Sequence, residues 1–293
     1  MALCVSTNHT LSKGEYEMKK IIAMLLVLTM VLSFTACAKT EAPAATEAPV
    51  VTEAPASAEE GILDGGADIA VEAAPAVMTH EEYAAAELET EVTVETYVQA
   101  KQGWWTDENG ISKATFYCQS EDGAYFLYNM PCSEEDYNAM TVGTKIRVTG
   151  FKVEWSGEVE IEDATYEILE GQFIAEALDV TELLASEELI AHQNEFVSFT
   201  GLTVEPSVDA NGNEAAFLYN WDGTGEVGND MYFNVSVNGQ VYNFCVESYL
   251  TGADTDVYKA VEALQIGDVI NAEGFLYWYN GANPHITAVT PAA

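Results

Sequence analysis

The sequence predicts an all-β protein built as two tandem, similar halves, each a five-stranded barrel with a short helix between strands three and four. A set of glycines recurs at a fixed spacing, and short apolar alternations are separated by turn dipeptides. Composition supports a folded body, because 48% of the 293 residues are apolar and 11% are aromatic.

The repeat is clearest in two stretches that begin with Gly, GTKIRVTGFKVEWSG at 143–157 and GDVINAEGFLYWYNG at 267–281. Four residues of the first stretch recur 124 positions later in the second: Gly143, Gly150, Phe151 and Gly157 match Gly267, Gly274, Phe275 and Gly281. Further along, Ile161 matches Ile286. Each stretch predicts the last hairpin of its half.

Turn and capping residues fix the other elements. Asp122-Gly123 and Asn238-Gly239 lie between apolar alternations and predict two-residue hairpin turns. Ser133 and Asp254 are the expected N-caps of the helix in each half. A short helix or turn is also expected before each half, at Thr79 with Glu82 and at Ser186.

This order of elements resembles the OB-fold, a small Greek-key barrel, over 78–170 and again over 171–293. Two small β-sandwiches are the rival fold, but they need more strands in each half. The chain is also similar to Gram-positive-type bacterial lipoproteins with tandem OB-fold-like domains. The resemblance to polymer-binding OB-folds implies a ligand face beside the loops after strands one and four.

Residues 1–37 are predicted to be an upstream extension followed by a signal peptide that starts at Met18. Two lysines precede an apolar run at 21–32, and Phe-Thr-Ala-Cys then ends at Cys37. That tetrapeptide resembles a lipobox, which implies lipidation of Cys37 and an extracytoplasmic protein anchored to the outer face of the bacterial cell membrane. A transmembrane anchor is the alternative, although the apolar run is short for a span.

Residues 38–77 are predicted to be a disordered tether. Thr-Glu-Ala-Pro occurs three times with a period of six, and the segment holds eight acids and one Lys. Such a composition cannot bury enough apolar surface to offset the loss of chain entropy.

The first hairpin is apolar on both faces. With Asp122-Gly123 as the turn, one set of residues is expected to face the core: Tyr117, Phe126 and Tyr128. The other set is expected on the outer face: Phe116, Cys118, Tyr125 and Leu127. An outer face of this kind requires a covering element or a ligand.

Aromatic residues near this face are the candidate ligand site. We predict a platform of Trp104, Trp105 and Trp155 with Tyr125 beside them. A parallel set in the second half includes Trp221 and Tyr279, with Tyr277 and Trp278 nearby. Such rings stack on sugars or bases, and the alternative is that they pack between the two halves.

Charge guides the expected ligand. The formal net charge is −38, and residues 78–293 hold 38 acids and 6 basic residues. A nucleic-acid partner is therefore not expected, although Lys145, Arg147 and Lys152 would form a local basic patch. The prediction is a non-catalytic binding module for a glycan or a peptide. The alternatives are an interaction scaffold with an envelope protein as partner and, below it, a carboxylate-dependent hydrolase.

Catalysis and cofactors have little support. No Gly-x-Ser-x-Gly, His-Glu-x-x-His or phosphate-loop motif occurs, so neither an enzyme nor a cofactor is expected. Glu158, Glu160 and Glu162 alternate with Val159 and Ile161, which is typical of a solvated strand face.

A metal site is weakly indicated at Asp209, Asn211 and Asn213, but the spacing departs from an EF-hand loop. A matching stretch at 107–110 favours a repeated turn instead. Three cysteines occur in the predicted folded part, Cys118, Cys132 and Cys245. An odd number of them predicts buried reduced thiols.

The lipidation hypothesis is tested by Cys37→Ala. We expect this variant to leave the membrane fraction and to appear in the medium, because the acyl chains are its predicted anchor. Fractionation followed by immunoblotting measures the distribution, with the wild-type protein as the reference that stays in the membrane. Retention of Cys37→Ala in the membrane would contradict the hypothesis.

Overall fold

The computed structural model describes residues 76–292. The signal peptide, Cys37 and the tether up to residue 75 lie outside the described residues. The described residues belong to one compact unit, Ala70–Ala293. Among 76–292, none of the helices combines the length and apolar character needed to cross a membrane.

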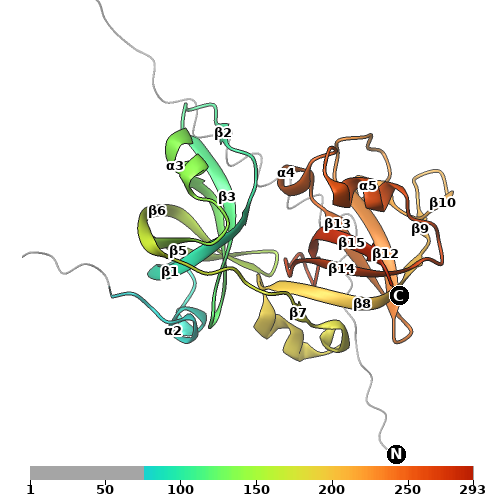
Figure 1. The fold of residues 1–293 in the computed structure, drawn as a ribbon, viewed down its shortest axis with the longest axis horizontal. Helices are drawn as coiled ribbons and strands as arrows, with labels where there is room; N and C mark the ends of the chain where they lie inside the picture. The colour runs from blue at the N-terminus through green and yellow to red at the C-terminus, as the bar shows by residue number, and fades with distance from the viewer. Residues whose placement is uncertain (1–75, 293) are drawn as a thin grey trace, which may run out of the picture. The chain divides into compact units, whose positions relative to one another are not determined.

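The first barrel is coloured cyan to yellow-green in Figure 1. Its strands are β1 (Thr90–Lys101), β2 (Trp105–Thr106), β3 (Ser112–Ser120), β4 (Gly123–Pro131), β5 (Thr144–Trp155) and β6 (Glu158–Gln172). β1 pairs antiparallel with both β3 and β5, and a parallel pairing of β4 with β6 closes the barrel. Its helices are α2 (His80–Ala85) and α3 (Glu134–Ala139).

The second barrel has the same topology and runs from yellow to red in Figure 1. Its five long strands are β8 (Phe196–Glu205), β12 (Met231–Val237), β13 (Gln240–Val246), β14 (Val269–Phe275) and β15 (His285–Pro291). β8 pairs with β12 and β14, and β13 meets β15 in parallel. Shorter elements are β7 (Leu178–Asp179), η1 (Thr181–Leu183), η2 (Glu187–His192), β9 (Ser207–Val208), β10 (Glu214–Ala215), β11 (Leu218–Tyr219), α4 (Ser248–Thr251) and α5 (Asp256–Glu262).

The predicted fold class is confirmed. Each barrel has five main strands, and the short helices α3 and α5 each follow the third of them. The caps at Thr79, Ser133 and Ser186 are also confirmed. Asp254 is wrong by one residue, because the Thr255 side chain is the group that accepts the Tyr258 N–H of α5.

The predicted faces of the first hairpin are reversed. Ser120 pairs with Gly123, so the turn residues are Glu121 and Asp122 rather than Asp122 and Gly123. The alignment of the first hairpin with the second is therefore off by one residue. A shift of one residue moves every side chain of a strand to the opposite face. The core face holds Phe116, Cys118, Tyr125 and Leu127, whereas Tyr117 and Phe126 pack with Phe275 of the second barrel.

The second hairpin follows the prediction, with Val237 paired to Gln240 across Asn238-Gly239. Its inward residues Phe233, Val235 and Phe244 belong to the core of the second barrel. The three cysteines are buried free thiols, as predicted. Cys118 pairs with Tyr125 across the first hairpin.

Two of the repeated glycines occupy equivalent β-bulges. Gly150 lies where the register of β5 with β6 shifts, and Gly274 lies where that of β14 with β15 shifts. A Cβ on Gly150 would approach Glu162 O to 2.7 Å, and one on Gly274 would meet His285 O and approach Ile286 Cα to 2.7 Å. The strands can cross this closely only where no side chain intervenes.

We therefore expect Gly150→Ala and Gly274→Ala each to lower the free energy of unfolding by about 1–3 kcal/mol, because the added methyl group overpacks the bulge. Urea unfolding measures the change. Gly103→Ala is the control, since a Cβ there has no neighbour within 4 Å. Unfolding curves of all three variants that superimpose on the wild type would contradict this account.

Candidate functional site

An aromatic cluster joins the two barrels. Tyr117 and Phe126 of the first hairpin are buried against Phe275 of β14, with ring centroids of Tyr117 and Phe275 4.7 Å apart. The Tyr117 hydroxyl is hydrogen bonded to Nδ1 of buried His285 at 2.6 Å. The outer face of the first hairpin is thus covered by the second barrel.

A buried carboxyl group also links the barrels. Glu158 is fully buried at the start of β6, and its Oε2 accepts the Trp278 backbone N–H at 2.8 Å. The same oxygen accepts Nε2 of Gln193 at 3.2 Å. Burial is the main cause that raises the pKa of Glu158 to about 8. Below that pH the group is therefore mostly neutral.

The predicted solvated stripe on β6 is wrong. Glu158 and Glu160 are 0% and 3% exposed, although alternation does place them with Glu162 on one side of the strand. The second barrel covers this side, and a pattern within a single strand contains no information about that cover. Glu162 is half-buried at the end of the stripe.

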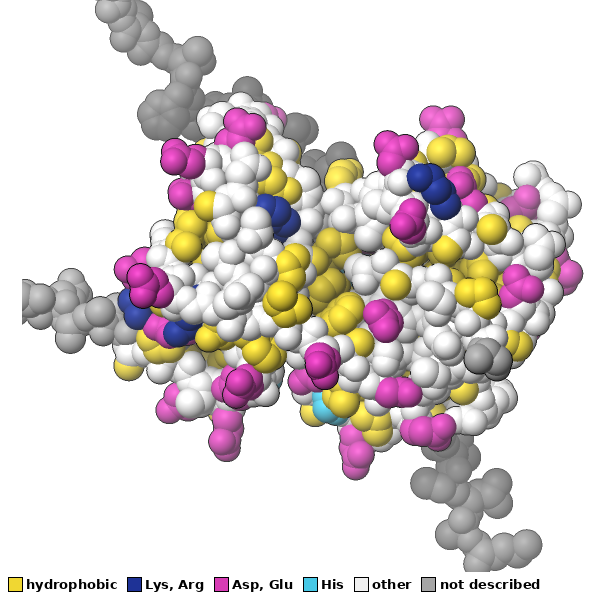
Figure 2. All heavy atoms as spheres, viewed as in Figure 1, with side chains coloured by type: hydrophobic (Ala, Val, Ile, Leu, Met, Phe, Trp, Pro, Cys, Tyr) yellow, Lys and Arg dark blue, Asp and Glu magenta, His cyan; other side chains and the backbone are white. Residues whose placement is uncertain are grey.

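A cleft of about 780 Å³ opens beside this interface. Its aromatic lining comes from both barrels: Trp104, Trp105, Phe126, Tyr128, Trp155, Tyr249 and Tyr277. Its polar lining is Gln102, Asn129, Glu160, Glu162, Glu247 and His285. Figure 2 shows apolar side chains gathered where the two barrels meet, with acidic side chains spread around them. We call this space the cleft.

Several cleft rings are open to solvent. Trp105 is 45% exposed, Trp155 54% and Tyr249 75%, so part of each residue is accessible to a ligand. Trp104 is half-buried, and its indole N–H donates to Cys132 O at 3.1 Å. The Trp105 ring also lies 4.9 Å from Nζ of Lys113. The cleft thus combines fixed and accessible aromatic surface.

The structure brings three of the six predicted platform residues together, Trp104, Trp105 and Trp155. Tyr125 is instead buried in the core of the first barrel, with its ring 4.9 Å from that of Tyr83. Trp221 is 77% exposed and does not line the cleft. Tyr279 is 51% exposed and does not line the cleft, although its ring lies 5.2 Å from that of Trp155.

Sequence reasoning missed the acidic residues of the cleft and Tyr249. Glu160 and Glu247 are both buried, which raises the pKa of Glu160 to about 8 and that of Glu247 to about 7. Glu247 accepts hydrogen bonds from Gln102 Nε2 and the Tyr249 backbone N–H. Burial lowers the pKa of His285 to about 3, so its ring is neutral. The sequence did contain a signal for Glu160, which belongs to an acidic stripe on the strand that closes the first barrel. The first hairpin of that barrel has an apolar outer face that needs a cover, and the same cover buries the stripe.

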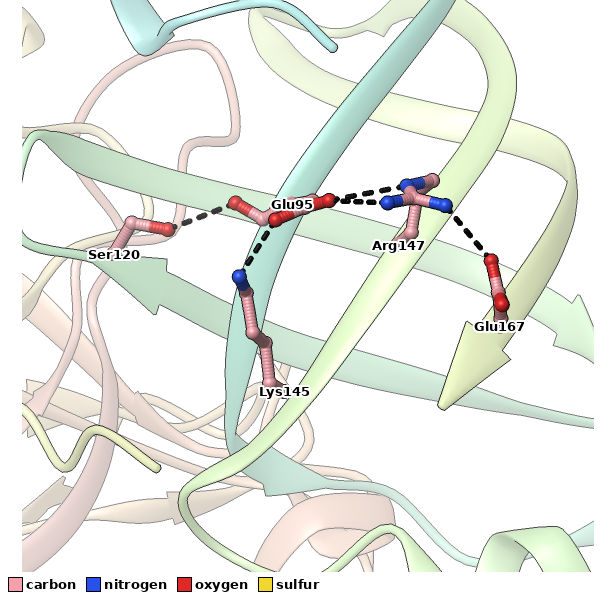
Figure 3. Close-up of polar contacts among 5 residues, drawn as sticks. All are labelled: Glu95, Ser120, Lys145, Arg147 and Glu167. Atoms are coloured by element: carbon pink, nitrogen blue, oxygen red, sulfur yellow. Dashed lines mark hydrogen bonds and ion pairs between the residues drawn. The ribbon is translucent and has the colours of Figure 1, made fainter. Parts of the chain in front are cut away.

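The basic residues of β5 are already engaged, as Figure 3 shows for two of them. The Glu95 carboxylate forms ion pairs with Lys145 Nζ at 2.6 Å and with Arg147 Nη2 at 2.7 Å. Arg147 also forms an ion pair with Glu167. Lys152 is buried and donates to the backbone oxygens of Tyr83, Ala84 and Ala86 at the end of α2. The patch expected from the sequence therefore serves structural contacts.

The loops at Asp107 and Asp209 form the same turn. Asp107 Oδ1 accepts the backbone N–H groups of Asn109 and Ile111, and Asp209 Oδ1 accepts those of Asn211 and Asn213. Within residues 76–292, His, Cys, Asp and Glu side chains form no group suited to holding a metal ion.

No family model and no curated protein sequence matches the chain. Similar solved structures include a murine DNA-binding protein with double-stranded DNA (10% identity, 69% of this chain and 96% of that chain, TM-score 0.34). A second is the Ifi202 HINa domain with double-stranded DNA (11% identity, 70% of this chain and 98% of that chain, TM-score 0.31). A third is a deletion mutant of the single-stranded DNA-binding protein from Thermus aquaticus (12% identity, 69% of this chain and 94% of that chain, TM-score 0.22). At such identities the likeness extends to the fold alone.

These comparisons contradict the predicted ligand and partners. The solved structures that resemble the chain are described as DNA-binding proteins and not as glycan- or peptide-binding modules, so the predicted ligand class and the exclusion of nucleic acid are not upheld. The exclusion depended on net charge, which describes the average field around the molecule. Stacking of bases on aromatic side chains contributes to binding without a cation at the ring.

Stability should depend on pH through Glu158. Its folded pKa of about 8 exceeds the ordinary 4.5, so folding binds a proton between these values and stability falls as pH rises across them. We expect Glu158→Gln, which keeps an oxygen for the Trp278 N–H, to reduce this fall by up to about 1.4 kcal/mol per pH unit.

Urea unfolding at intervals from pH 5 to pH 9 measures the effect. Exposed Glu170 on the same strand supplies the control, and Glu170→Gln should keep the wild-type slope. Glu160 and Glu247 leave a residual slope in Glu158→Gln because burial raises their pKa values as well. Equal slopes in Glu158→Gln and wild type would contradict the assignment.

Proposed function

We propose that this protein binds its ligand by stacking flat unsaturated rings in the cleft between its two barrels. The observation that carries the proposal is the convergence of Trp105, Trp155 and Tyr249, each with an accessible ring, on one cavity of about 780 Å³. This volume lies in the range of small-molecule sites, which are concave, mostly apolar and furnished with a few polar groups.

The position of the rings within the fold supports the same function. Trp104 and Trp105 follow β1, and Trp155 ends β5, the fourth long strand of the first barrel. OB-folds bind ligands beside the loops at these two positions. Tyr249 and Tyr277 come from the second barrel, so the complete wall exists only when the barrels are docked.

Two sources can supply such rings, a free heteroaromatic molecule and the bases of a single nucleic-acid strand. The free molecule is favoured by the carboxyl groups in the wall, since a strand carries a phosphate with each base. A single strand is the second candidate because stacking on tryptophans beside these OB-fold loops is how sequence-tolerant strand binding operates.

We also propose that the barrels are held at the outer face of the cell membrane through Cys37. The order of positive residues, apolar run and lipobox-like tetrapeptide supports this placement. A lipid anchor with an acidic, Pro-containing tether would hold the cleft away from the membrane surface.

The stacking proposal is tested by titrating the purified full chain with quinoline, and separately with a thymidine 12-mer, while tryptophan fluorescence is recorded. We expect one of the two to quench the emission saturably. Trp105→Ala and Trp155→Ala should each weaken that binding at least about fivefold, because stacking contributes about 1–3 kcal/mol per ring.

Trp221→Ala is the matched control, since Trp221 is exposed and lies outside the cleft. It should bind with wild-type affinity. Binding of neither compound, or equal weakening by Trp221→Ala, would overturn the proposal. Saturable binding of the 12-mer without binding of quinoline would assign the strand as the ligand source.

A further inference from the structure

Glu160 is a buried acid with no N–H or basic donor in the described part of the chain, and its side-chain hydrogen bond is with a second acid, Glu162. It is 3% exposed and lines the cleft. Among the hydrogen bonds and ion pairs formed within residues 76–292, none is made to its carboxyl group by an N–H donor or a basic side chain. Glu158, by contrast, accepts two N–H donors, and Glu247 also accepts two.

The neighbour that acts on the charge of Glu160 is a second acid and not a cation. Glu162 lies two residues further along β6 on the same side, and it raises the pKa of Glu160 in addition to burial. A like charge at such a position disfavours ionisation of Glu160. A positively charged ligand in the cleft would reverse this effect and stabilise the carboxylate.

The aromatic wall favours the same sign of charge. Ring faces of Trp and Tyr carry negative potential and attract ammonium and other organic cations. The chain already uses Trp105 in this way, with Lys113 Nζ 4.9 Å from its ring. A hard metal ion requires several oxygen ligands, which rings do not provide, so the wall suits an organic cation better.

We propose that the ligand of the cleft is a small flat organic cation, a heteroaromatic ring with a permanent positive charge, whose charge is matched by Glu160. This inference rests on the stacking function proposed above and specifies the class of its ligand. The ring stacks among Trp105, Trp155 and Tyr249, and the charge lies against β6.

The test compares two bicyclic compounds of the same shape by isothermal titration calorimetry at pH 8.5 with the full chain. N-methylquinolinium is permanently charged, whereas quinoline is neutral at this pH. We expect the cation to bind at least tenfold more tightly than quinoline. Glu160→Gln should abolish this preference and leave the affinity for quinoline within twofold of the wild-type value.

Glu170→Gln removes an exposed acid from the same strand and is the matched control for the general negative field. It should keep the tenfold preference. Equal binding of both compounds by the wild type would overturn the cation inference and leave the stacking function intact. Binding of neither compound would also overturn the cation inference, and the stacking function would then depend on binding of the thymidine 12-mer.

A measurement on the wild type covers the case in which Glu160→Gln does not fold. Affinity for N-methylquinolinium should rise severalfold from pH 6 to pH 9 as cleft carboxyls ionise, while that for quinoline stays constant. The other titratable groups beside Glu160 are Glu158, Glu162, Glu247, Tyr128, Tyr277 and His285. A constant cation affinity over this range would contradict the inference, as would a retained preference in a folded Glu160→Gln.

Discussion

The packing of Tyr117 and Phe126 against Phe275 is the contact on which the cleft depends. Both faces of the first hairpin are apolar, so the face that does not fill the first barrel must be covered. Its cover is the second barrel, and docking brings Tyr249, Tyr277 and His285 beside the tryptophans of the first barrel. Without this contact, the aromatic residues would form two separate and incomplete walls.

The sequence is sufficient to predict the barrels because their determinants are local or repeated. Caps such as Ser133 and bulge glycines such as Gly150 and Gly274 act on the neighbouring backbone. The two glycines are equivalent positions of the repeat, so each supports the assignment of the other. The pairing of the first hairpin is different, since Asp122-Gly123 and Glu121-Asp122 are both acceptable turns. The choice of turn decides which side chains of the hairpin face the core, and the turn that the sequence favours places Tyr125 on the wrong face.

The acidic wall of the cleft could not be predicted for a related reason. Glu160 alternates with Ile161 in the way that a solvent-facing residue does, and only docking of another domain makes it a buried one. Trp104, Trp105 and Trp155 were within reach because their loops have a known use in OB-folds. Tyr249 belongs to α4 of the other barrel, and pairing it with them requires the interface itself.

The duplication has a consequence at one pair of equivalent positions. Glu162 of the first barrel is the equivalent of His285 in the second, because the two pair with the equivalent residues Phe151 and Phe275. The sequence match of Ile161 with Ile286 is therefore wrong by two positions. Both line the cleft, yet one is an acid and the other a neutral imidazole bonded to Tyr117. Two equivalent positions of the repeat thus supply unlike groups to a single site. A ligand with a charged end would enter it in one orientation only.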